Sequence, residues 1–137
     1  MTDDGGLSRF QRRMRAIPPA VRESVRPALV KQAEGMAATM RAVVPVDSGD
    51  LRGSIAVTGP GQATPPYSQP GGAMVIGENQ AAVTVGNSDV RYAHLVEYGT
   101  SKNEAKPFFW PSVRLHRARV AAAIKRAIGK AVREAGR

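Results

Sequence analysis

The chain has 137 residues, 42% of them hydrophobic, which suits a single domain over residues 1–137 with a real core. It contains no cysteine, which excludes disulfides and thiolate zinc sites. No apolar run approaches the ~20 residues of a membrane span, and residues 1–4 lack the basic start of a secretory signal. We therefore expect a soluble intracellular protein with no membrane partner.

The net charge of +9 is concentrated in two blocks. Residues 9–31 carry seven Lys and Arg against one Glu, and residues 108–137 carry eight against one. Residues 32–107 carry five basic residues against seven acidic ones. Basic blocks of this kind can attract DNA, an acidic partner or an anionic membrane, and charge alone does not choose among them.

Two helices are expected in the first third of the chain. A short one is predicted within residues 1–18, because four apolar residues follow one another at spacings of three, four and three: Leu7, Phe10, Met14 and Ile17. A long amphipathic helix is expected from residue 19 to residue 43. Pro27 lies inside it and predicts either a kink or a helix that begins near Arg26.

The middle of the chain predicts turns and short strands. Residues 45–52 are rich in turn formers, and residues 54–58 alternate as a strand does. Residues 59–73 contain four prolines, four glycines and no charge, which predicts a long mobile loop. Residues 74–76 and 82–85 are β-rich, and we expect them to form a hairpin around the turn at residues 77–80.

The last third predicts a short helix over residues 92–98, with Gly99 as a left-handed stop, and a long helix from Pro111 to about residue 135. The expected fold class is α+β. A small antiparallel sheet packs against two long amphipathic helices, with a short helix and a long mobile loop. Three arginines seven residues apart project from the last helix, opposite its apolar stripe: Arg119, Arg126 and Arg133.

Residues 92–111 hold five of the seven aromatic residues, which indicates a structural corner. Glu97 lies within this segment, between Val96 and Tyr98. A buried carboxylate needs a partner to offset its desolvation, and three candidates are open: Arg52, Arg91 and backbone amides near Thr100. We interpret Glu97 as an internal structural tie between this turn and the sheet.

No catalytic, cofactor or metal site is predicted. His94 and Glu97 are three residues apart and could supply two metal ligands, but a surface histidine beside a structural glutamate explains them better. The basic helices carry no aromatic residues between their arginines, so reading of a DNA sequence is not expected. Phosphate contact stays open, and a solvated face or an interface with an acidic neighbour is the preferred interpretation.

Two blocks of sequence resemble one known family. The first is residues 45–55, PVDSGDLRGSI, and the second covers Val85-Gly86 and the motifs from Tyr92 to Pro111. Their order and spacing are similar to those of the tail-component family of HK-ninety-seven-type siphophages. The residues that match the family's motifs are Asp47, Gly49, Leu51, Arg52, Tyr92, Glu97, Tyr98, Gly99, Thr100, Pro107, Phe108 and Pro111.

The resemblance implies a structural virion protein of the tail or neck, without enzymatic activity or cofactor. It implies a ring, usually a hexamer, that completes the tail at its head-proximal end and joins it to the head. The implied partners are further copies of the chain, the tail tube protein, a head-side connector or stopper protein, and DNA only as it passes through the channel. The alternative is a basic DNA-binding accessory protein. Candidate interface residues are Pro65, Pro66 and Tyr67 in the loop and the three arginines of the last helix.

Overall fold

The computed structural model describes residues 8–9, 12, 18–45 and 49–136. The chain is α+β, with two long helices and a two-stranded antiparallel sheet. Its elements follow in this order: α2 (Pro19–Val43), α3 (Asp50–Gly53), β1 (Ala56–Thr58), β2 (Ala82–Thr84), α4 (Ala93–Tyr98) and α5 (Phe109–Ala135). The apolar face predicted for the N-terminal helix, from Leu7 to Ile17, lies outside the described residues.

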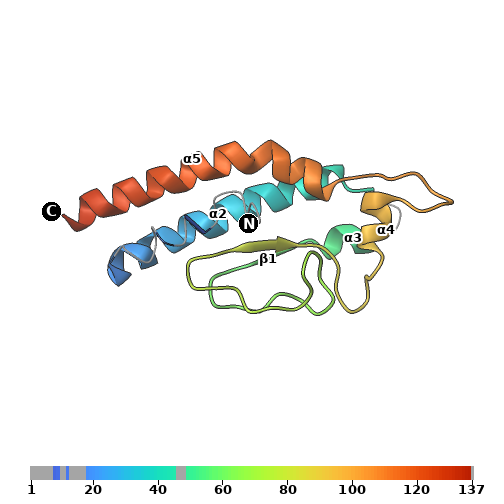
Figure 1. Ribbon diagram of the computed structural model, residues 1–137, viewed down its shortest axis with the longest axis horizontal. Helices are drawn as coiled ribbons and strands as arrows, with labels where there is room; N and C mark the ends of the chain where they lie inside the picture. Colours follow the sequence, from blue (N-terminus) through green and yellow to red (C-terminus); the bar gives the residue numbers. More distant parts are fainter. Residues whose placement is uncertain (1–7, 10–11, 13–17, 46–48, 137) are drawn as a thin grey trace.

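The helix α2 lies at the centre of the molecule. It packs along the antiparallel helix α5 and also contacts both strands, with the sheet and its loops against it (Figure 1). Its buried residues recur every three or four positions: Val21, Val25, Leu29, Ala33, Ala37 and Met40. The helix begins at Pro19 and ends at Val43, as predicted, and only the alternative start near Arg26 is wrong. Pro27 is exposed inside it, where water can solvate the carbonyl that loses its amide partner.

The strands pair differently from the sequence prediction. Strand β1 pairs with β2, with Val57 opposite Val83. The run at residues 74–76 pairs with residues 62–64 instead, through bonds such as Ile76 N to Gln62 O at 2.7 Å. The predicted hairpin between residues 74–76 and 82–85 is therefore wrong, because period-two alternation identifies a strand but not its partner.

Residues 59–73 fold back and pair with two later segments of the chain. Ala63 forms a β-bridge with Val75, and Gln69 forms one with Val85. The buried Thr64 hydroxyl accepts the Met74 amide at 2.8 Å and donates to the Gly72 carbonyl at 3.1 Å. These bonds link the segment to residues 74–76 and to Val85, although the buried Ser68 hydroxyl lacks a hydrogen-bond partner among the described residues. Its mobility in solution stays a prediction.

The main core lies where the end of α2 meets the start of α5, α4 and the sheet. Its buried members are Ala37, Met40, Val44, Leu51, Ile55, Val85, Val90, Ala93, Phe108 and Phe109. A second, smaller cluster at the other end of the helix pair consists of Val21, Val25 and Ala131, with Ala127 and Ile128 packed against it. The elements that carry the family-like motifs all converge on the main core.

Candidate functional site

The short helix α4 separates a buried side from an exposed one. Ala93 and Glu97, four residues apart, are its buried residues. Tyr92, which precedes α4, and Leu95 and Tyr98 within it recur every three residues and are exposed, Tyr98 with 67% of its surface. A six-residue helix thus places one carboxylate in the core while it presents a row of apolar side chains to the outside.

The Glu97 carboxylate accepts three backbone hydrogen bonds from the start of α5. Its Oε1 accepts the amides of Phe108 at 2.9 Å and Phe109 at 2.8 Å, and its Oε2 accepts the amide of Trp110 at 3.2 Å. Only 7% of Glu97 is exposed. Because the N-terminus of a helix carries a partial positive charge, this buried carboxylate lies where its charge is stabilised.

Glu97 binds all the backbone N–H groups in the first turn of α5 that have no partner within the helix. The first four N–H groups of a helix have no partner within the helix. Here the first three belong to Phe108, Phe109 and Trp110, which Glu97 binds, and the fourth position is Pro111, which has no N–H. Phe108 supplies no side-chain cap of its own. Glu97 therefore acts as the N-terminal cap of α5 from eleven residues away.

The predicted partners of Glu97 were wrong, although its role as an internal tie is close to what the structure shows. Arg52 is exposed, and Arg91 Nε donates to the Ser88 carbonyl at 3.1 Å. The amide of Thr100 bonds to the Asn103 carbonyl at 2.9 Å. Glu97 ties α4 to α5, not to the sheet. The usable sequence signal was the start of a helix without Ser, Thr, Asp or Asn before it, since such a start needs an acceptor from elsewhere.

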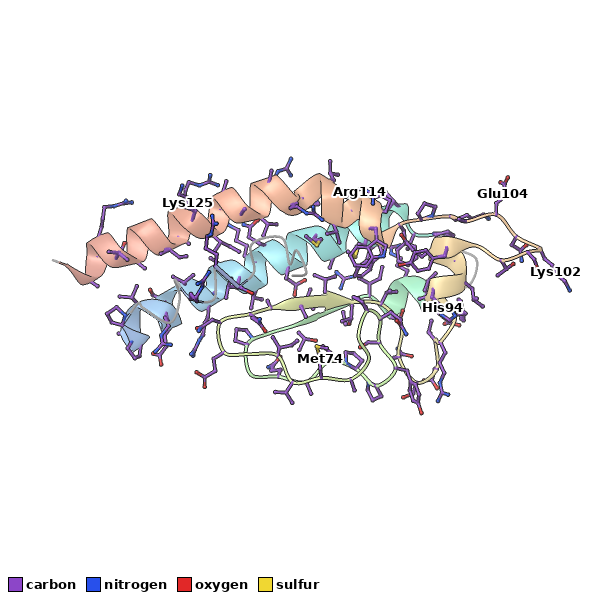
Figure 2. The ribbon with its side chains drawn as sticks, in the orientation of Figure 1. Met74, His94, Lys102, Glu104, Arg114 and Lys125 are labelled. Carbon is purple, nitrogen blue, oxygen red and sulfur yellow. The ribbon has the colours of Figure 1, made fainter. Side chains whose placement is uncertain are left out.

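Residues 99–107 form an arm that projects from the body between α4 and α5 (Figure 1). Lys102 and Glu104 lie at its tip and point away from the body (Figure 2). Its base is fixed by the Lys106 amide, which bonds to the Val96 carbonyl at 2.8 Å. The Thr100 hydroxyl accepts the amides of Lys102 and Asn103 at 3.2 and 3.1 Å. The arm is therefore hydrogen bonded both at its base and near its tip.

Gly99 joins α4 to this arm with φ 77° and ψ 175°. The positive φ agrees with the predicted stop, but the ψ is extended, so the residue is not left-handed helical. A Cβ on Gly99 would lie 2.7 Å from the Ala105 amide nitrogen. Both the backbone conformation and the close approach of the arm require glycine here.

The aromatic cluster is divided between the core and the surface. Phe108 is fully buried, and Phe109 packs edge-to-face against Trp110 with ring centroids 5.0 Å apart. The Trp110 indole Nε1 donates to the Tyr98 hydroxyl at 2.7 Å, which fixes the exposed Tyr98 ring against α5. Tyr92 is 38% exposed, so it lies at the edge of the predicted corner and not within it.

The structure brings the two sequence blocks together. The Ser54 hydroxyl donates to the Leu51 carbonyl at 2.7 Å and accepts the Gly86 amide at 2.9 Å. Leu51 is buried, and Gly49 takes φ 83° at the start of α3, where the turn requires glycine. Ser54 was not singled out from the sequence, although it is the residue that joins the blocks. Asp47 lies outside the described residues.

The remaining predicted residues are on the surface. Pro107, Pro66 and the three arginines of α5 (Arg119, Arg126 and Arg133) are exposed, and Pro65 and Pro111 are half-buried. Tyr67 is 54% exposed, with the Arg91 guanidinium 3.7 Å from its ring centroid. This cation–π contact places the tip of the loop beside the second sequence block.

A small hollow of about 50 Å³ adjoins Glu97, between α4, the start of α5 and the loop. Its walls include Gln69, Pro70, Val85, His94 and Phe108. A volume of this size suits one or two water molecules. His94 is exposed (Figure 2). The other histidine, His116, is buried, with Nε2 2.6 Å from the Thr39 hydroxyl.

The described residues lack both a metal-binding cluster and a membrane-spanning helix. Within residues 8–9, 12, 18–45 and 49–136, no three His, Cys, Asp or Glu side chains gather closely enough to hold a metal ion. In the same part of the chain, no helix has the length and apolar character needed to cross a membrane.

The comparisons with known proteins cover the first motif block, and the second as far as Gly99. No curated protein and no solved structure gives a significant match. The matching family model is the one described as "Bacteriophage HK97-gp10, putative tail-component", over residues 8–99. That range is about two thirds of the chain and includes both Ser54 and Glu97. The chain therefore belongs to the HK97-gp10-like family of phage tail components.

Proposed function

We propose that this protein assembles into a ring at the head-proximal end of a phage tail, where it completes the tail and joins it to the head. Membership of a tail-component family supports a structural role in the virion. The finer role is inferred from the surfaces that the fold presents. The proposed partners are further copies of this chain, the tail tube protein and a head-side connector or stopper protein. The ring that we propose is a hexamer of this chain.

The observation that carries this proposal is the exposed row of Tyr92, Leu95 and Tyr98 beside the projecting arm. The row is an apolar patch at the end of the molecule where the Glu97 cap fixes α4 to α5. Contiguous exposed apolar residues mark surfaces that another protein covers. We assign this surface to the neighbouring copy in the ring.

The contact we propose joins different surfaces of adjacent copies. A head-to-tail contact of this kind closes into a ring when the rotation between copies is suitable. The arm and the row of apolar residues lie at the same end of the chain, so they can engage a neighbour at once. The loop tip at Pro65, Pro66 and Tyr67 is left to contact the tail tube or the connector. DNA passes through the channel, and the protein is assembled in the host cytoplasm and then resides in the virion.

Electron microscopy of particles made without this gene tests the joining role. We expect filled heads beside separate tails. Intact head–tail particles in the deletion strain would refute the proposal.

Complementation with two matched variants then tests the surface. Leu95→Gln changes the exposed row, and Leu115→Gln makes the same change on α5, where the side chain is 66% exposed. We expect Leu95→Gln to prevent joining while the purified protein stays folded, and Leu115→Gln to restore intact particles. Equal complementation by both variants would mean that the row on α4 is not the ring contact.

A further inference from the structure

The helix α5 has one side packed against α2 and the opposite side free in the described chain. His116 bonds to Thr39 of α2, and Ala131 packs with Val21 and Val25 of that helix. These contacts define the inward side of α5. The exposed residues on its other side include nearly all of its charge.

That charge is almost entirely positive. The exposed cations of α5 are Arg114, Arg117, Arg119, Lys125, Arg126, Lys130 and Arg133. The single acidic residue within Phe109–Ala135 is Glu134, which lies 4.0 Å from Lys130 near the end of the helix. The helix α2, by contrast, mixes Arg and Lys with Glu23 and Glu34. The positive field is therefore a property of α5 and not of the helix pair.

Helical geometry sorts these cations into two rows. An α-helix turns by about 100° per residue, so residues seven apart or eleven apart lie within about 20° of each other. Arg119, Arg126 and Arg133 form one row, at intervals of about 10.5 Å along the axis. Arg114 and Lys125 form a second row, about 80–140° around the helix from the first; both are labelled along α5 in Figure 2.

Small residues lie between the two rows. Ala118 and Ala122 are exposed there, at angles between those of the arginine row and of Lys125. The outward side of α5 is thus a narrow crest of short side chains with cations on both flanks, and the exposed Leu115 and Val132 lie at the angles of the first and the second row. Its crest lacks aromatic anchors, which protein interfaces use for affinity.

We propose that this side of α5 binds duplex DNA in the major groove without regard to sequence. The major groove is wide enough to admit an α-helix, and its two edges are lines of phosphates. The alanine crest allows the helix to approach, and the two rows of cations can then reach the phosphates of both strands. Alanine side chains form no hydrogen bonds to base edges, so this face has no means of reading sequence at its crest.

The proposal has a quantitative consequence for salt dependence. Each phosphate neutralised releases counterions, and the logarithm of the binding constant falls with the logarithm of salt with a slope of about −0.9 per contact. With five to seven cations engaged, we expect a slope of roughly −4.5 to −6.3. This binding does not depend on the ring proposed above, because a single helix supplies the surface.

Fluorescence anisotropy with the full chain and two labelled duplexes of unrelated sequence tests the proposal. One variant combines Arg119→Gln, Arg126→Gln and Arg133→Gln. The control combines Arg9→Gln, Arg12→Gln and Lys31→Gln, which are exposed cations outside α5 and outside the arm. Each set removes three positive charges and takes the net charge from +9 to +6. Circular dichroism verifies that both variants are folded.

We expect the α5 variant to lose about 10²-fold in affinity near 0.1 M salt and about 2.7 from the slope. The control should keep both values close to those of the original chain. An equal loss in both variants would overturn the proposal, since net charge alone would then explain binding. A preference of more than about tenfold for one duplex would overturn the absence of sequence reading. Tighter binding of poly-L-glutamate than of DNA would assign the face to an acidic protein.

If the triple variant is unfolded, the single variant Arg126→Gln tests the proposal. It should reduce the magnitude of the slope of the logarithm of the binding constant against the logarithm of salt by about 0.9. An unchanged slope would overturn the proposal. The particles formed in the deletion strain report on the joining role independently of this result.

Discussion

The two ends of the α2–α5 helix pair are built differently. At one end the helices meet the sheet, α3 and α4 around ten buried residues, and Glu97 caps the start of α5. At the other end the cluster of buried residues consists of Val21, Val25 and Ala131, with two half-buried side chains against it. Burial of apolar surface is the main stabilising term, so the sheet end should determine global stability. The end with the smaller cluster then adds length to the helix pair and carries positive charge.

The largest effect is expected from Phe108→Ala at the sheet end. Phe108 is fully buried and directly precedes α5, and removal of a buried phenyl ring costs about 3–5 kcal/mol. Tyr67→Ala is a control in which a ring 54% exposed is removed, and it should cost less than about 1 kcal/mol. Chemical denaturation measures both. A loss below about 1 kcal/mol for Phe108→Ala would show that this end does not dominate stability.

Glu97→Gln should destabilise the protein by about 2–4 kcal/mol, because hydrogen bonds to a charged group contribute about 1.5–3 kcal/mol each. The amide of glutamine keeps one acceptor oxygen but points a donor at the start of α5, where only donors are present. Glu104→Gln at the exposed tip of the arm is the matched control and should be nearly neutral. Equal free energies of unfolding for both variants would contradict the capping role of Glu97.

Gly99→Ala should cost about 1–3 kcal/mol, for a positive φ and for a Cβ 2.7 Å from the Ala105 nitrogen. Gly61 has nearly the same φ, +76°, but open space where the Cβ would be. Gly61→Ala therefore measures only the free-energy cost of a positive φ for a residue with a Cβ, and we expect this cost to be about 1 kcal/mol. The difference between the two variants isolates the close approach of the arm. If they are equal in thermal denaturation, the arm is not held at its base.

The sequence predicted the helices well and the pairing of the strands poorly. The helices follow from apolar spacing along one segment, so α2 and α5 were located to within two residues of their observed starts. The partner of residues 74–76 depends on contacts with a distant segment, which no local pattern specifies. Residues 59–73 also form hydrogen bonds to Met74 and Val85, outside the segment, and no local pattern specified these partners.

The site was predicted in part for similar reasons. Glu97 stood out because a carboxylate among apolar residues requires partners. Those partners are backbone amides, which every residue but proline carries, so the residue types could not identify them. The exposure of Tyr98 and Leu95 could not be predicted, since the sequence alone does not distinguish an apolar side chain in a core from one at an interface.

The smallest loss of stability is expected at the end of the helix pair away from the sheet. Val25→Ala should cost about 1–2 kcal/mol, less than the loss of a large buried side chain, because Val25 is fully buried in the smaller cluster. We expect hydrogen exchange to accelerate at the beginning of α2 and the end of α5, with little change at the start of α5. Regions with few buried apolar contacts open locally, at less than the global free energy.

Val44→Ala makes the same truncation in the main core, where Val44 is 3% exposed. It should accelerate exchange throughout the chain, because the sheet end opens only in global unfolding. If Val25→Ala and Val44→Ala instead produce the same uniform acceleration, the helix pair is one cooperative unit. The far end of α5 would then be as rigid as the Glu97 corner. If only Val25→Ala produces local opening, at the beginning of α2 and the end of α5, then the smaller cluster alone holds the cationic end of α5. Binding of a polyanion there could then order this end without any change at the sheet end.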